Sequence, residues 1–141
     1  MGLSVVVTNL DHDGNVTPWT LMAEEKGVSV RRFLNFCDSE RAFSPQTLNS
    51  FPRVNFKPGC CLLDLDHLEH QLDINTRLVA LGAAANSCGS LTDITAAAAV
   101  VRRVSPKALL YVDGVHYAPH RLPDVQVLLL GDIGPISGAR L

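Results

Sequence analysis

Polar side chains follow three of the apolar runs in this sequence, each at the point where a strand would end. The first group runs from Asp11 to Asn15, the second is Asn86, and the third runs from Asp113 to His116. Because the carboxyl ends of parallel strands meet at one edge of a sheet, we expect these groups to share a crevice there. The side chains expected to converge are His12, Asn86, Asp113 and His116.

Other chemistry is open to the same residue types. Acidic and imidazole side chains from two of these segments could form a nitrogen and oxygen ligand set for a metal ion. Its members would be Asp11, His12, Asp13, His116 and His120. A second pair, His67 and His70 with Glu69 between them, fits a solvated helix face as well as a metal site. Each residue taken alone also fits a turn or a helix cap.

The apolar runs predict an α/β fold. Their hydrophobicity is continuous rather than alternating, which is typical of strands buried on both faces of a parallel sheet. We predict five mainly parallel strands in a doubly wound sheet, in an order resembling 2-1-3-4-5, with helices on both faces. The predicted strands are Ser4 to Leu10, Val28 to Phe36, Arg77 to Ala83, Ala108 to Val112 and Val125 to Leu130.

Three helices are expected between these strands. The first takes Thr17 as its N-cap, has a proline at its first helical position and ends at Gly27. The second begins at Asp66, where an acid three residues later resembles a capping box. The third begins near Ser90 and ends before Ser105, which precedes a proline.

Composition limits the class of protein. With 141 residues, 47% of them hydrophobic, the chain can bury the core of one domain, residues 1–141, with a long surface excursion at about 37–59. The formal net charge of -2 provides no basic stripe for nucleic acid and no polybasic patch for a membrane. Four cysteines include a vicinal pair and no C-x-x-C spacing, which favours a reducing cytoplasm over a disulfide framework.

Three segments, in this order, resemble motifs of the class V aminotransferase and cysteine desulfurase-like family of pyridoxal phosphate (PLP) enzymes. The first resembles the segment with a histidine above the cofactor ring, the second an N-x-x-G turn, and the third the D-x-x-H/Q signature followed by D-V-Q. The matching residues are His12, Asn15, Pro18 and Trp19, then Asn86 and Gly89, then Asp113, His116 and Asp124 to Gln126. The resemblance implies the three-layer α/β/α large domain of a PLP-dependent transferase.

The resemblance also implies a role for each candidate residue. Asp113 would lie beneath the ring nitrogen and keep it protonated, so that the cofactor can act as an electron sink. His12 would stack on the ring, and Asn86 and His116 would donate hydrogen bonds to the phenolate oxygen. An amino acid substrate and a homo-oligomer are implied in the same way.

Departures from the family limit the expected activity. The family bonds its cofactor to a lysine beyond the D-V-Q segment, whereas the lysines here are Lys26, Lys57 and Lys107. The segment Val127 to Leu141 departs from the family, and the glycine-rich turn that holds the cofactor phosphate would precede Val5. We therefore expect a truncated large-domain fragment that binds PLP by ancestry and lacks turnover. The alternative is a non-catalytic α/β module for binding or self-association.

Overall fold

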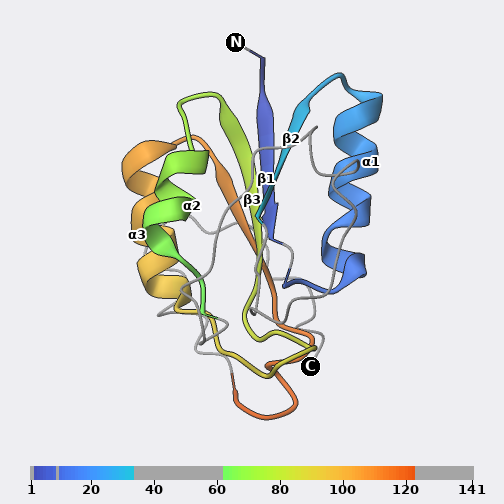
Figure 1. Cartoon of the computed structure of the whole chain (residues 1–141), viewed down its shortest axis with the longest axis vertical. Coiled ribbons are helices and arrows are strands. Elements are labelled where there is room, and N and C mark those ends of the chain that lie inside the picture. Colours follow the sequence, from blue (N-terminus) through green and yellow to red (C-terminus); the bar gives the residue numbers. More distant parts are fainter. Residues whose placement is uncertain (1, 9, 34–61, 123–141) are drawn as a thin grey trace, which may run out of the picture.

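The computed structural model describes residues 2–8, 10–33 and 62–122, and its centre is a sheet of four parallel strands (Figure 1). The strands are β1 (Ser4–Thr8), β2 (Ser29–Phe33), β3 (Thr76–Gly82) and β4 (Leu109–Asp113). Their order, β2-β1-β3-β4, confirms the predicted order for these four strands. The predicted fifth strand and the predicted excursion at about 37–59 lie outside the described residues.

The register of the sheet brings the carboxyl ends of three strands to one edge. All residues of β1 are buried, and this strand pairs with β2 on one side and β3 on the other. At the last rung between β3 and β4, Gly82 pairs with Asp113. One residue further, the Ala83 N–H donates a hydrogen bond to the carbonyl oxygen of Asp113 at 2.8 Å. The loops after β1, β3 and β4 therefore leave the sheet side by side.

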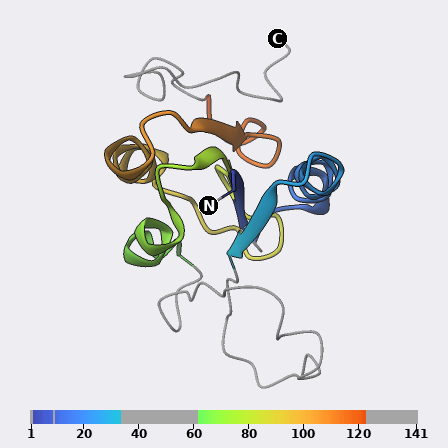
Figure 2. The same ribbon diagram turned by 90° about the horizontal axis from the view of Figure 1, so that it is seen from above.

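Helices cover both faces of the sheet and make three α/β/α layers (Figure 2). They are α1 (Thr17–Glu25), α2 (Leu65–Gln71) and α3 (Ile94–Val104). On one face, Val5 and Val7 of β1 belong to a buried cluster with Ala23 of α1. On the other face, Val6 belongs to a cluster with Leu68 of α2 and with α3. Among the described residues, no helix is long and apolar enough to cross a membrane.

The first two helices begin at residues other than those predicted. Thr17 is the first residue of α1 rather than its N-cap, which is Val16, and the Thr17 hydroxyl donates to Asp13 Oδ1 at 2.6 Å. The N-cap of α2 is Asp64, whose side chain accepts a hydrogen bond from the backbone N–H of Asp66. A carboxylate two residues earlier than expected thus takes the capping role, because it accepts from the free N–H groups of the first turn.

The third helix begins later than predicted and ends where predicted. Its N-cap is Asp93, which accepts a hydrogen bond from the Ala96 N–H at 2.9 Å. The expected start near Ser90 is wrong, because Leu91 still pairs with Ala84 in an isolated antiparallel bridge. The C-cap of α3 is Ser105, ahead of the proline that prevents the helix from continuing.

Candidate functional site

Three loops at the carboxyl edge of the sheet hold the four residues expected to converge. His12 follows β1, Asn86 follows β3, and Asp113 and His116 lie at the end of β4 and in the turn after it. The imidazole rings of His12 and His116 have centroids 6.0 Å apart and planes tilted by 51°. Three of the four side chains are exposed and Asp113 is half-buried, so these groups are accessible to a ligand at this edge.

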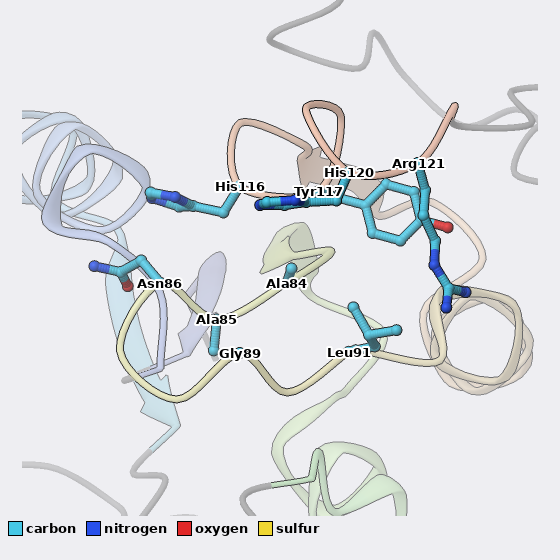
Figure 3. Close-up of a pocket in the computed structure, with 9 residues that line it drawn as sticks. All are labelled: Ala84, Ala85, Asn86, Gly89, Leu91, His116, Tyr117, His120 and Arg121. Carbon is cyan, nitrogen blue, oxygen red and sulfur yellow. The ribbon is translucent and has the colours of Figure 1, made fainter.

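A pocket of about 420 Å³ lies between the loop after β3 and the turn after β4 (Figure 3). Asn86 and His116 lie at one end of it, and Leu91 and Arg121 lie at the other. Its lining residues are Ala84, Ala85, Asn86, Gly89, Leu91, His116, Tyr117, His120 and Arg121. His12 and Asp113 are not among them, so the predicted residues flank one end of this pocket and do not all line it.

Sequence patterns did not identify Tyr117 and Arg121 as site residues. The turn that begins at Gly114 brings them over the loop after β3, since the N–H groups of Tyr117 and Ala118 both donate to the Gly114 carbonyl oxygen. A run of aromatic and basic residues after the Asp113 to His116 segment was the available signal. It does not by itself tell which of them turn back over the sheet edge.

The carboxylate of Asp113 is oriented by the backbone that follows it. Its Oδ1 accepts a hydrogen bond from the Val115 N–H at 2.9 Å. Within the described ranges, no hydrogen bond is made by the second carboxylate oxygen. That oxygen can therefore accept a hydrogen bond from a donor on a ligand, such as a protonated ring nitrogen.

The ring of His12 is held by the short 3-10 helix η1 (Asp13–Asn15), for which His12 is the N-cap. Its Nδ1 accepts a hydrogen bond from the Gly14 N–H at 3.1 Å, and its carbonyl oxygen accepts one from the Asn15 N–H at 2.8 Å. Because Nδ1 is an acceptor, the neutral ring carries its proton on Nε2. The imidazole is thus fixed in tautomer while its face stays exposed.

The most perturbed ionisable group at this edge is Asp11, the residue before His12. Burial raises the pKa of the Asp11 carboxyl from its ordinary 3.8 to about 6, against hydrogen bonds from the Gly82 N–H and the Asn15 amide, and the negative charge of Asp113 also raises it. Both bonds measure 2.8 Å. An added Cβ on Gly82 would lie 2.6 Å from Asp11 Oδ1, so the carboxylate contacts bare strand backbone.

The metal alternatives receive no support from the geometry. In residues 2–8, 10–33 and 62–122, no cluster of three or more His, Cys, Asp and Glu side chains is arranged to hold a metal ion. His70 bonds the Asp66 carbonyl oxygen through Nδ1, and His67 bonds Gln71, so both use their own helix. Glu69 pairs with Arg103 of α3 at 2.9 Å.

Comparisons with known proteins agree with one another. The sequence model of the family "Aminotransferase class-V" matches residues 59–133, just over half of the 141-residue chain. The chain is 35% identical over 127 residues to the aminotransferase-like protein FGM3 of Gibberella zeae. The matched region covers 90% of this chain and 26% of that protein. It is 26% identical over 127 residues to the cysteine desulfurase of Serratia proteamaculans, covering 90% of this chain and 25% of that enzyme.

A solved structure shares the fold. The cysteine desulfurase CsdA of Escherichia coli, in its S-sulfonic acid form, superposes with a TM-score of 0.65 at 24% identity, covering 90% of this chain and 26% of that one. The chain thus spans about a quarter of the length of these relatives.

Proposed function

Because the chain belongs to the class V aminotransferase family, we propose that its carboxyl-edge site binds pyridoxal 5'-phosphate. The observation that supports this most directly is the convergence of His12 and His116, with ring centroids 6.0 Å apart, next to Asn86 and Asp113. A protonated pyridine ring with a phenolate oxygen requires a flat group to stack on, donors for the phenolate and an acceptor for the ring N–H. An imidazole face, an amide with a second imidazole, and an oriented carboxylate supply these. The residues present therefore fit the ring of the cofactor.

The proposed role of each residue follows from its environment. Asp113 would accept a hydrogen bond from the ring nitrogen through the oxygen that Val115 does not use, and so favour the protonated nitrogen. His12 would cover one face of the ring with an imidazole whose tautomer the Gly14 N–H sets. Asn86 and His116, at the same end of the pocket, would donate to the phenolate oxygen (Figure 3).

We propose that binding by this chain is non-covalent and that the chain alone has no turnover. Bound PLP supplies an electron sink for chemistry at the α-carbon of an amino acid, but the family's chemistry also needs a lysine that bonds the cofactor. The described lysines are Lys26, at the end of α1, and Lys107, just before β4, and both lie at the opposite edge of the sheet. The third lysine, Lys57, lies outside the described residues.

The substrate and the assembly are also proposals. One relative is by name a cysteine desulfurase and another an aminotransferase-like protein, and both names point to an amino acid as the substrate of the whole protein. We propose a homo-oligomer, supported by large apolar side chains left exposed in the stretch that contains β4 and the turn after it. These are Leu109, Val115 and Leu122, which are 57%, 54% and 90% exposed.

The test is a titration of the purified chain at pH 8 that follows Trp19 fluorescence. PLP is compared with pyridoxine 5'-phosphate, which has an alcohol in place of the aldehyde and cannot bond covalently to lysine. We expect saturable binding of both, weakened roughly tenfold by Asp113→Asn, which keeps the shape of the side chain and removes its charge. The matched control is Asp66→Asn, an exposed carboxylate on α2.

Two outcomes would contradict the proposal. One is an Asp113→Asn variant that binds pyridoxine phosphate as well as the parent protein does. The other is the absence of any binding of pyridoxine phosphate while PLP labels several lysines without saturation, because that pattern reflects aldehyde chemistry and no ring pocket.

A further inference from the structure

The carboxylate of Asp11 is an unusual contact between a loop and the strand edge. It belongs to the loop after β1, yet its Oδ1 accepts the backbone N–H of Gly82, the last residue of β3, across 71 positions of sequence. A Cβ at Gly82 would lie 2.6 Å from this oxygen, which is closer than real Cβ contacts. The absence of a side chain at this position is therefore what lets the carboxylate reach the strand.

The second oxygen of Asp11 sets the orientation of the Asn15 side-chain amide. Asn15 Nδ2 donates to Asp11 Oδ2 at 2.8 Å, and Asn15 Oδ1 accepts from the Trp19 indole N–H at 3.2 Å. A carboxylate only accepts and an indole only donates, so the amide satisfies both partners in one orientation and neither when flipped. Asn15 is 2% exposed, so water cannot replace a lost partner.

These hydrogen bonds hold the segment that contains His12 from both sides, through Asp11 before it and Asn15 after it. The Trp19 ring packs edge-on against Tyr111 of β4, with centroids 5.0 Å apart and an interplanar angle of 68°. Asn15 also donates its backbone N–H to the His12 carbonyl oxygen at 2.8 Å. The hydrogen-bonded side chains of Asp11, Asn15 and Trp19 thus connect β3 to α1 and β4. His12 lies between Asp11 and Asn15 in the chain.

We infer that Asp11 is a positioning residue, which holds the His12 ring in place at the site by fixing the Asn15 amide and tying the loop to β3. The inference rests on the proposed function, because His12 is the proposed cover of the cofactor ring. Asp11 itself touches no ligand in this scheme. Its effect on binding passes through His12.

The test exchanges the carboxylate of Asp11 and the amide of Asn15, first one at a time and then together. Asp11→Asn places two amide N–H groups face to face or forces the Asn15 amide to flip away from Trp19. Asn15→Asp places two carboxylates face to face. The double variant restores a donor and an acceptor at every contact, with the acid now at position 15. Asp13→Asn is the matched control, since it removes one charge from the same turn and touches neither Gly82 nor Asn15.

The first readout needs no cofactor. The chain has one tryptophan, so its indole N–H gives one signal in a proton–nitrogen correlation spectrum, and the His12 ring signals can be assigned by comparison with a His12→Ala variant. At pH 8, well above the Asp11 pKa of about 6, we expect both single variants to shift the indole and His12 signals. The double variant should return them toward those of the parent.

The second readout is the dissociation constant of pyridoxine phosphate, measured beside the urea midpoint of each variant. We expect a roughly tenfold weaker affinity in each single variant and recovery to within about threefold in the double variant. Unchanged affinity in the single variants would overturn the inference, as would an unmoved His12 signal.

A third result would also count against the inference. In it, the double variant regains the indole signal and the urea midpoint of the parent but does not regain its affinity for pyridoxine phosphate. In that case the hydrogen bonds serve stability alone. If the parent protein itself does not bind pyridoxine phosphate, the proposed function fails, and the His12 signals of the free protein still decide whether Asp11 positions that ring.

Discussion

Asp11 shows how much one side chain at this edge depends on its surroundings. A carboxyl group after a strand is ordinarily solvated, but this one is largely enclosed and bonds Gly82 and Asn15. Burial disfavours its charged form more than these bonds favour it, so its pKa rises to about 6. A group whose pKa is raised by folding is protonated more readily in the folded state than in the unfolded chain.

The pH dependence of stability follows from that shift. Because the folded pKa of Asp11 lies above the unfolded value of 3.8, this group contributes most stability below pH 3.8, and the contribution is lost as pH rises through about 6. The difference in unfolding free energy between the parent and Asp11→Asn should fall by about 2 kcal/mol between about pH 4.5 and about pH 7.5. Urea denaturation of both proteins across this range measures it. A difference that stays constant with pH would show that Asp11 titrates normally.

Helix α3 shows how local chemistry sets the limits of an element. Its buried residues, which include Ala97 and Val101, face the sheet, and Arg102 and Arg103 lie in its last turn, where positive charge suits the helix dipole. At its start, Asp93 caps the Ala96 N–H. The helix positions the site indirectly, because the loop that carries Asn86 spans the distance between β3 and this cap.

Loss of the α3 cap should cost measurable stability. Asp93→Ala leaves the Ala96 N–H without its side-chain partner and should lower the free energy of unfolding by about 1 kcal/mol, while Asp93→Asn should retain most of it. Thr95→Ala, an exposed change in the same turn, is the control. Equal urea midpoints for Asp93→Ala and Thr95→Ala would contradict the capping role.

The whole molecule combines a well-buried sheet with apolar side chains that remain at its surface. Central strands such as β1 and β3 are buried on both faces, whereas Leu109 of β4 and Leu122 after it are strongly exposed. Exposed apolar surface of this kind marks interaction sites in soluble proteins.

We expect the protein to associate with itself in solution. Light scattering after size exclusion should give a mass above that of the 15.2 kDa chain at micromolar concentration. Leu122→Lys should weaken association about tenfold, because it places a charge on the most exposed of these apolar side chains. Ile74→Lys, at a residue that is 59% exposed and follows α2, should leave the mass unchanged. A monomer at every concentration would rule the proposal out.

The sequence by itself determined the α/β class, the four described strands, their order and the approximate helices. The class, the strands and the helices depend on patterns that are local in the chain: continuous apolar runs, Pro18 near a helix start and Ser105 before a proline. The order follows from the doubly wound topology that an alternation of such strands and helices predicts. The convergence of His12 with His116 was also accessible, because strand order alone brings the carboxyl ends of parallel strands to one edge.

Only the tertiary structure decided which partners each polar group acquires. The enclosure of Asp11 depends on the bare backbone at Gly82, and the tie of Arg31 in β2 to Asp73 before β3 joins residues that are 42 positions apart. The pocket likewise requires the turn with Arg121 to lie over the loop after β3. Such contacts depend on strand register and loop path, to which residues distant in sequence contribute together, so no local pattern encodes them.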